Sequence, residues 1–205
     1  MKLARALAVH EARVWAGLAL WLTRRRDGVG DGVRALPYAR AQASTMYAFA
    51  FVCLVETVGM SFFTAPYPGI HEAVLALDVY TVLLVLGFHA GSVVRPHTAG
   101  PEGLRIRRGA GLDLRIPVAL IGTVRRDLCF PGNDVPGILD VPVASQTSVT
   151  VELTAPVTAA RLFGRPREIR TVRFHADEPH AAVEAIRGLM AAGPAHRVGR
   201  GGAGA

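Results

Sequence analysis

Lysine is almost absent from this chain of 205 residues: Lys2, next to the first methionine, is the only lysine among the 23 basic residues. Walker-type phosphate loops, protein kinases, Schiff-base enzymes and serine–lysine acylases all require a lysine within the folded domain. A lysine at the second position does not meet that requirement. The scarcity of lysine therefore excludes these enzyme classes.

The chain is also poor in cysteine and lacks the common catalytic motifs. Cys53 and Cys129 are the only cysteines and form no CxxC pair, so we expect neither a disulfide framework nor a thiolate zinc site. Neither GxSxG nor HExxH occurs, and the seven histidines are scattered along the chain. We therefore predict a protein that is not an enzyme, with no catalytic residues, no metal site and no cofactor.

Positive charge is missing from one long segment, residues 46–94, which carries three acidic residues and no basic one. Residues 1–45 carry eight basic and three acidic side chains, and residues 95–205 carry fifteen and ten. With 51% hydrophobic residues, the composition is unusually apolar for a chain that folds in water. This pattern is typical of two membrane spans joined by a short external loop and flanked by cytoplasmic basic segments.

We predict a transmembrane helical hairpin over residues 46–94, with spans at 46–65 and 73–94. Each span has at least 20 residues, which at ~1.5 Å per residue reaches the ~30 Å thickness of a bilayer core. Pro66 and Pro68 interrupt the helix between the spans. Arginines occur on both flanks and not in the loop, so we expect a multi-pass protein of the cell membrane with both termini in the cytoplasm. The alternative is a soluble protein with two unusually apolar buried helices.

Residues 1–26 need a separate interpretation, because their uninterrupted apolar run, Val14–Leu22, is too short to cross a bilayer. Apolar side chains recur there at helical spacing, and Trp15 and Trp21 suit the membrane interface. We therefore predict an amphipathic helix that lies on the inner membrane surface. The alternative is a short helix packed on the soluble domain. Residues 27–45 begin with a glycine-rich stretch and are expected to form a flexible linker.

After residue 100 the pattern changes to strict alternation of apolar and polar side chains. Leu104–Arg108 and Leu112–Ile116 alternate on either side of the turn Gly109–Gly111, which predicts a β-hairpin. An antiparallel β domain is therefore expected. Its further strands are predicted at residues 119–127, 138–143, 148–153 and 169–174.

A C-terminal helix is predicted to follow these strands. Asp177 is a suitable N-cap, Pro179 lies in the first turn, and Gly193 ends the apolar periodicity. Several short strands and one amphipathic helix describe a small antiparallel β-barrel closed by a helix, over residues 100–192. Residues 193–205, rich in glycine and alanine, are expected to be a disordered tail.

The β region resembles a known family. The run Leu112–Arg126, LDLRIPVALIGTVRR, and the ending Val172–Pro179 are similar to bacterial pleckstrin-homology-like domains that are attached to membrane hairpins. In that family a strand ends at an Ile-Pro, here Ile116-Pro117, before an Ile-x-x-Val-Arg segment, here Ile121–Arg125. The resemblance implies an α+β membrane protein with a two-helix transmembrane hairpin and a pleckstrin-homology-like barrel. It also implies lipid headgroups, peptides or other proteins as ligands.

The acidic residues and the histidine inside the predicted spans are Glu56, Asp78 and His89, which are the candidate intramembrane polar residues. A charged side chain in a bilayer costs about 2.5–3.5 kcal/mol on insertion scales, so it usually has a structural or functional reason. Glu56 and Asp78 are expected at similar depth, where two carboxylates would share a proton or hold a cation. Three interpretations stay open: a structural role, docking of a partner protein, and handling of protons or cations in an oligomer.

Gly87 and Gly91 form a GxxxG pair, which permits close approach of two helices. Packing within the hairpin is the favoured interpretation, and a dimer interface is the alternative. Small residues are common in apolar helices, so the pair alone does not decide between them.

Arginines are the candidate ligand-binding side chains of the β region. They contact either an anionic ligand or lipid phosphates, or they merely make the domain compatible with an anionic membrane surface. Residues 95–205 carry fifteen basic and ten acidic side chains, which is only a mild excess of positive charge. No motif for reading nucleic-acid bases is visible, so no nucleic-acid partner is expected. The candidates are Arg105, Arg107, Arg108, Arg125 and Arg126.

The sequence thus predicts a membrane-anchored cytoplasmic binding or scaffolding module whose ligand it does not identify. Its expected partners are membrane lipids, another protein and a second copy of the chain. The alternative function is that of an oligomeric membrane protein that handles or senses protons or cations through its intramembrane carboxylates.

Overall fold

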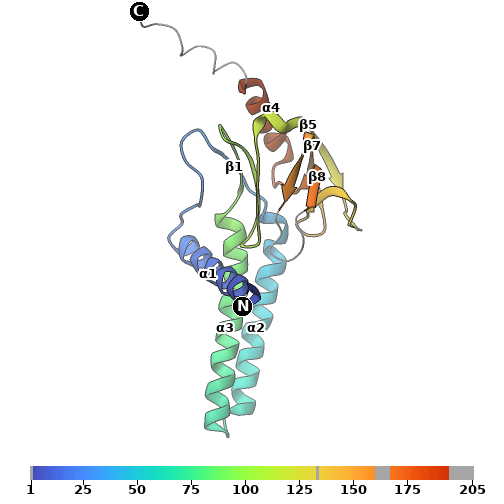
Figure 1. Ribbon diagram of the computed structural model, residues 1–205. Helices are drawn as coiled ribbons and strands as arrows, with labels where there is room; N and C mark the ends of the chain where they lie inside the picture. Colours follow the sequence, from blue (N-terminus) through green and yellow to red (C-terminus); the bar gives the residue numbers. More distant parts are fainter. Residues whose placement is uncertain (1, 133, 160–166, 194–205) are drawn as a thin grey trace, which may run out of the picture.

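The computed structural model describes residues 2–132, 134–159 and 167–193, and the chain has two parts (Figure 1). Three helices form a stem: α1 (Lys2–Leu22), α2 (Arg40–Thr64) and α3 (Pro68–Val94). Two β-sheets and α4 (Pro179–Ala192) form a β domain at one end of the stem. The protein is therefore of the α+β class. The tail expected at 193–205 lies, except for Gly193, outside the described residues.

Helices α2 and α3 pack against each other as a hairpin. Both are long and apolar enough to cross a membrane. They are longer than expected, because α2 begins at Arg40 rather than at residue 46 and α3 begins at Pro68 rather than at residue 73. Proline is tolerated in the first turn of a helix, where its missing N–H would have no partner anyway. Across the connection, the Thr64 hydroxyl lies 3.0 Å from Nδ1 of His71.

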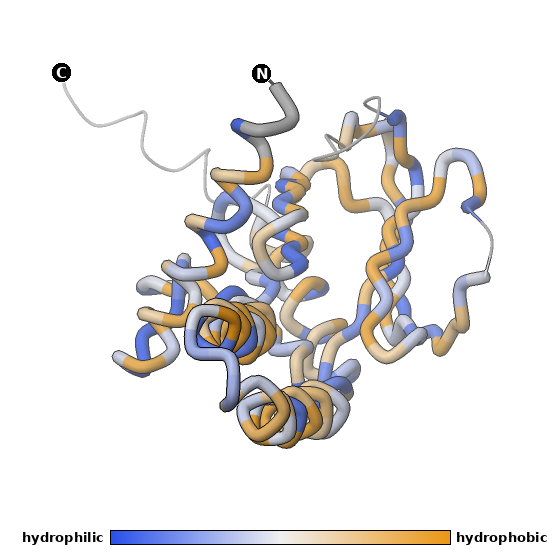
Figure 2. The backbone as a smooth tube through the Cα atoms, turned by 90° about the horizontal axis from the view of Figure 1, so that it is seen from below, coloured by the Kyte–Doolittle hydropathy of each residue, from blue (hydrophilic) through white to orange (hydrophobic). Residues whose placement is uncertain are grey.

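The hairpin buries few of its side chains. Ala50 and Cys53 of α2 pack on Val85 of α3 and form a narrow seam. Large apolar side chains between Tyr47 and Phe88 are exposed on both helices. Seen from below, apolar residues occur around both hairpin helices, whereas α1 alternates apolar and hydrophilic residues (Figure 2). Helices that are apolar on all sides are usually enclosed by other protein or by lipid.

Helix α1 packs mainly across α3, and it also contacts the β domain, where Arg13 donates a hydrogen bond to Ala110 between β3 and β4. Val14 is buried against Gly87, and Gly17 lies against Gly91. The GxxxG pair therefore contacts α1, whereas packing within the hairpin was the favoured expectation. The periodicity of a short amphipathic helix shows which of its faces is apolar but not which surface covers that face.

The first sheet has four antiparallel strands, in the order β1 (Arg34–Leu36), β2 (His97–Gly100), β3 (Gly103–Arg108) and β4 (Leu112–Ile116). Strands β3 and β4 form the predicted hairpin, with Ile106 opposite Leu114. The prediction of a flexible linker over residues 27–45 is wrong, because this segment contains β1 and, from Arg40, the start of α2. A strand of three residues is too short for alternation to reveal it.

The second sheet has the order β5 (Ile121–Cys129), β7 (Thr147–Ala159), β8 (Arg167–Phe174) and β6 (Gly137–Val141). A short 3₁₀ helix, Val118–Leu120, replaces the start of the strand expected at 119–127. Strand β6 runs parallel to β8, so this sheet is not wholly antiparallel. Within the described residues the two sheets stay separate. The prediction of a closed antiparallel barrel is therefore wrong, because alternation identifies buried faces but not which strands pair.

Both sheets and α4 share one apolar core. The C-terminal helix is present as predicted, but Asp177 is not its N-cap. The Asp177 carboxylate instead accepts a hydrogen bond of 3.1 Å from the backbone N–H of Arg40, the first residue of α2. A carboxylate is favoured at this end of a helix by the helix dipole, so the β domain caps a helix of the stem. Fully buried core side chains include Leu104, Ile106, Ile116, Val149, Phe174 and Ile186.

Gly87→Leu is expected to displace α1 from α3. A Cβ atom at position 87 would lie 2.6 Å from Cγ1 of Val14, closer than non-bonded carbon atoms approach each other. Limited trypsin digestion of the protein in detergent should therefore cut α1 at Arg5 or Arg13 sooner in this variant than in the wild type. The matched control is Gly59→Leu on α2, where nothing lies within 4 Å of an added Cβ. Equal digestion of the two variants would contradict the packing described.

Candidate functional site

A buried arginine joins the stem to the β domain. Arg107 lies on β3, and its side chain is only 2% exposed. Its Nε donates a hydrogen bond to the carbonyl oxygen of Pro96 at 2.9 Å, and Nη2 donates to the carbonyl oxygen of Asp27 at 3.0 Å. The Asp27 carboxylate lies 3.6 Å from Nη1. Because a buried charge is costly unless it is paired and hydrogen-bonded, these contacts hold the segment after α1 and the residue before β2 in place.

A second arginine ties the same carboxylate to the stem. Arg95 follows α3 directly, and its Nε lies 3.5 Å from Oδ2 of Asp27. Its Nη2 donates a hydrogen bond of 3.1 Å to the carbonyl oxygen of Arg13 in α1. The backbone N–H of Asp27 donates to the carbonyl oxygen of Val94 at 2.9 Å. The Asp27 carboxylate thus lies between two guanidinium groups and links α1, α3 and β3.

A neutral histidine lies next to Arg107 in the interior. The Nδ1 atom of His97 accepts a hydrogen bond of 3.0 Å from the backbone N–H of Arg107, which assigns the ring proton to Nε2. Nε2 donates to the carbonyl oxygen of His175 at 3.1 Å. Complete burial lowers the pKa of His97 from its ordinary 6.5 to about 3. Tyr38 stacks on this imidazole with 4.4 Å between the ring centroids, so His97 is a structural part of the junction.

A cavity of about 200 Å³, here called the arginine pocket, opens at this junction. One of its ion pairs is internal, because Arg105 makes two hydrogen bonds to the Asp113 carboxylate. This pairing holds the pKa of Asp113 below its ordinary value. Four guanidinium groups and two carboxylates leave the pocket with an excess of positive charge. The charged lining residues are Arg13, Arg95, Arg105, Arg107, Asp27 and Asp113.

Two arginines that line the arginine pocket have a donor that is not fully satisfied. The Nη1 atoms of Arg95 and Arg107 are both buried and lack a hydrogen-bond partner among the described residues. Unsatisfied buried donors are uncommon in native proteins, because leaving a charged donor unpaired costs more than a typical hydrogen bond contributes. The pocket therefore combines an excess of positive charge with arginines that are incompletely paired, which suits an anion.

Glycine is required where the chain passes the side chains of Arg105 and Arg107. Gly28 has a φ of +70°, a conformation that side chains other than glycine rarely adopt. A Cβ atom there would lie 3.0 Å from Nη2 of Arg107 and 3.2 Å from Nη1 of Arg105. The segment after α1 can therefore approach both guanidinium groups only because residue 28 has no side chain.

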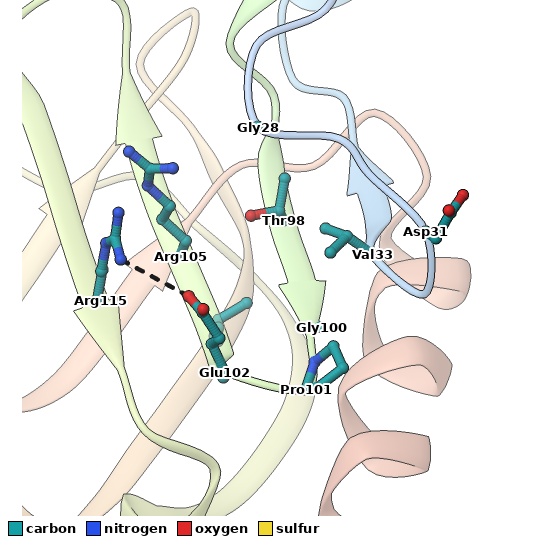
Figure 3. A pocket seen from close by; sticks show the side chains of 11 residues that line it. Gly28, Asp31, Val33, Thr98, Gly100, Pro101, Glu102, Arg105 and Arg115 are labelled. Carbon is teal, nitrogen blue, oxygen red and sulfur yellow. Dashed lines mark ion pairs between the residues drawn. The ribbon is translucent and has the colours of Figure 1, made fainter.

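A second cavity, of about 320 Å³, lies on the β domain and is here called the β cleft. Figure 3 shows Arg105 and Arg115 on neighbouring strands, with Val33 from the segment before β1 on the other side. Arg115 pairs with Glu102 at 3.6 Å, and both side chains are exposed, so this ion pair contributes little stability. Among the described lining residues of the β cleft, no buried polar atom lacks a partner. The arginine pocket is therefore the stronger candidate site.

The structure divides the five candidate arginines of the β region between different surfaces. Arg105 and Arg107 line the arginine pocket. Arg108 is exposed at the end of β3 and lines a different cavity. Arg125 and Arg126 lie on β5 in the other sheet, where the first pairs with a glutamate of β7 and the second contacts a histidine of α4. Alternation shows on which side of a strand a residue lies, so it could not separate these sets.

Sequence reasoning missed three residues of the arginine pocket: Arg13, Arg95 and Asp27. Arg13 and Asp27 fell in segments interpreted as an interfacial helix and a linker, and Arg95 was used only to orient the hairpin. No periodic pattern connects residues so far apart in the chain. The one available signal was the position of Arg95, which ends the long segment without basic residues.

The polar residues of the hairpin lie on different surfaces. Glu56 is exposed on α2, whereas Asp78 is half-buried on α3 and its Oδ2 is buried without a hydrogen-bond partner. His89 is buried, with its ring 4.8 Å from that of Tyr47. In the described part of the chain no interaction joins Glu56 to Asp78, and no group of three or more potential metal ligands occurs. Proton or cation handling stays a prediction.

Comparison with known proteins adds no relative: no family model, curated protein or solved structure matches this chain. The resemblance to pleckstrin-homology-like domains therefore has no support from these comparisons. The two separate sheets also lack the closed barrel that the resemblance implied. Within the described chain, a positive and partly buried cavity suits the binding of an anion.

Gly28→Ala is expected to destabilise the protein more than Gly32→Ala. Both glycines have positive φ, 70° and 73°, so both substitutions introduce a similar backbone strain. Only residue 28 faces guanidinium groups, whereas nothing lies within 4 Å of an added Cβ at residue 32. The loss of unfolding free energy should be roughly 1 kcal/mol larger for Gly28→Ala because of this overpacking. Denaturant unfolding in detergent measures both, and equal losses would contradict the contact with the arginines.

The neutral state of His97 predicts a loss of stability in acid. Its pKa is about 3 in the folded chain and near 6.5 when exposed, so between these values only the unfolded chain binds the proton. The contribution of neutral His97 to the free energy of unfolding is fully present above pH 6.5. It decreases as the pH falls toward 3, by about 1.4 kcal/mol per pH unit.

Unfolding midpoints measured at a series of pH values should therefore show a smaller pH dependence for His97→Gln than for the wild type. Burial also lowers the pKa of His175, so part of the dependence should remain in this variant. An unchanged pH dependence in His97→Gln would contradict the assignment.

Proposed function

We propose that the protein is a membrane-anchored binding module without enzymatic activity, in which α2 and α3 cross the cell membrane and hold the β domain at its cytoplasmic surface. Both helices are long and apolar enough for this role. Residues 46–94 carry no basic side chain, whereas the segments on both sides do, which favours cytoplasmic termini.

One observation supports the proposal: the hairpin exposes large apolar side chains along most of its length up to the junction, whereas the described part of the β domain exposes only Leu128, Phe130 and Val135. Large exposed apolar side chains extend from Tyr47 to Phe63 on α2 and from Ile70 to Phe88 on α3. After Phe88, α3 is largely buried, and it is followed by the polar junction at Arg95. Exposed apolar surface costs about 25 cal/mol per Å² in water, and a bilayer around the hairpin removes that cost.

The β domain supplies the binding part of the proposed function. It has its own apolar core, and both the arginine pocket and the β cleft are lined by its residues. We propose membrane lipids as partners at this end of the molecule, since arginines next to an anionic leaflet are attracted to it. Within the proposed span, Glu56 favours a second copy of the chain or another protein as a partner, because a carboxylate exposed to lipid is costly.

Cysteine labelling tests the proposed topology. In a chain whose native cysteines are replaced, Cys53→Ala with Cys129→Ser, a thiol is introduced by Gly69→Cys in the first turn of α3 or by Gly188→Cys in α4. Nothing lies within 4 Å of an added Cβ at either position, so neither change should disturb the fold. A membrane-impermeant maleimide added to intact spheroplasts should label residue 69, and should label residue 188 only after the membrane is permeabilised.

Two controls accompany this labelling experiment. The cysteine-free parent should not react, and both single-cysteine variants should react fully in detergent. The proposed function fails if residue 188 is labelled in intact spheroplasts, or if alkaline carbonate releases the protein from the membrane fraction.

A further inference from the structure

We propose that the arginine pocket binds a phosphate group, either that of a phospholipid headgroup or a free phosphate ion. The proposal deepens the proposed function and rests on it for the position of the pocket relative to the membrane. The chemistry of the pocket itself is argued from its side chains alone.

The charges in the pocket are unequally matched. Arg105 is satisfied by Asp113 through two hydrogen bonds. Arg95 and Arg107, in contrast, share the single carboxylate of Asp27, and both of their ion-pair distances to its Oδ2, 3.5 and 3.6 Å, are longer than those of typical charge-assisted hydrogen bonds. The Arg13 guanidinium donates to a backbone carbonyl, that of Ala110, at 3.2 Å. One anion in the pocket would therefore meet guanidinium groups that are only partly neutralised.

The incompletely paired guanidinium groups point to the same ligand. The Arg107 side chain is 2% exposed, and its Nη1 has only the long contact of 3.6 Å to the Asp27 carboxylate. Nη1 of Arg95 is buried and has no hydrogen-bond partner among the described residues. Phosphate offers several acceptor oxygens and matches the planar fork of a guanidinium group, so a single phosphate can accept from more than one arginine at once.

The volume of the pocket limits the size of its ligand. Pockets that enclose whole organic ligands usually exceed ~300 Å³, whereas the arginine pocket has about 200 Å³. At ~30 Å³ for each water molecule, that space holds only a few waters. It therefore fits a phosphate group with its nearest substituents, and the remainder of a larger ligand would extend out of it.

The proposed membrane position brings the pocket to the headgroups. Helix α3 has 27 residues, which at ~1.5 Å per residue give ~40 Å, close to the thickness of a bilayer with its headgroup layers. Phe88 is the last large apolar side chain that α3 exposes, and Arg95 follows the end of the helix. Arg95 is thus placed about 10 Å beyond the exposed apolar surface, at the depth of lipid phosphates.

Inorganic phosphate is the first probe. The full-length protein, purified in an uncharged detergent, is titrated with sodium phosphate while sodium chloride keeps the ionic strength constant. The melting temperature should rise with phosphate concentration, because a ligand that binds only the folded state stabilises it by mass action. The constant ionic strength separates this effect from general screening of charge.

Three variants connect the stabilisation to the pocket. Arg13→Gln should weaken the apparent affinity by about tenfold or more, since it removes one charged donor. Asp113→Asn should strengthen it, because this change removes a carboxylate from the lining and releases Arg105. The matched control is Arg108→Gln, at an exposed arginine outside the pocket lining, which should leave the affinity unchanged. Arg107 is left intact because it also holds the junction together.

Lipid nanodiscs distinguish the two sources of phosphate. The wild type and Arg13→Gln are inserted into discs of phosphatidylcholine alone or of phosphatidylcholine with phosphatidic acid. Stabilisation of the wild type by phosphatidic acid, reduced in Arg13→Gln and not displaced by added phosphate, identifies the headgroup. Stabilisation by inorganic phosphate with no effect of phosphatidic acid identifies the free ion. The proposal is overturned if neither probe stabilises the protein, or if Arg13→Gln and Arg108→Gln respond alike.

Failure of this inference is distinct from failure of the proposed function. The phosphate titration is made in detergent and does not depend on topology, whereas cysteine labelling does not depend on the pocket. If phosphate does not stabilise the protein but the labelling is as expected, only the proposed phosphate site is contradicted. If phosphate stabilises the protein but residue 188 is labelled in intact spheroplasts, only the proposed topology is contradicted.

Discussion

The structure depends on the burial of one guanidinium group, that of Arg107, between the stem and the β domain. A buried charge is tolerated only when other groups converge on it, and here a carbonyl from each of two separate segments and the Asp27 carboxylate do so. Asp27 is in turn held by Arg95 and by the backbone at the end of α3. Removing either partner would leave an uncompensated charge in the interior, so the chain before β1, the end of α3 and β3 are fixed together.

A second, independent connection joins the β domain to the other helix of the hairpin. The Asp177 carboxylate, in the segment between β8 and α4, caps the first residue of α2. Arg95 and Arg107 hold the end of α3, so both hairpin helices are attached to the β domain by short polar contacts rather than by flexible connections.

Local patterns in the sequence predict those parts of the fold that depend on neighbouring residues. Uninterrupted apolar runs predict α2 and α3, and alternation around Gly109–Gly111 predicts the β3–β4 hairpin. What could not be predicted depends on residues far apart in the chain: the pairing of the short strand β1 with β2, the parallel pairing of β6 with β8, and the packing of α1 on α3. The arginine pocket belongs to this second group, since Arg13, Arg95 and Arg107 meet only after α1 has packed and β3 has formed. Asp177 shows the same limit of local patterns. Its position in the sequence suits an N-cap of α4, but its carboxylate caps α2.

At the junction there is a physical reason for arginine in place of lysine. Arg107 donates in two directions at once, from Nε to the carbonyl oxygen of Pro96 and from Nη2 to that of Asp27, while its Nη1 lies 3.6 Å from the Asp27 carboxylate. A lysine ammonium is a compact point charge without this rigid fork, and it loses its proton more readily when it is buried. Burial lowers the pKa of Arg107, but arginine starts so far above neutrality that the side chain stays charged. Arginine is therefore the residue that can fix the stem to the β domain and keep a positive charge available to a phosphate at the same place.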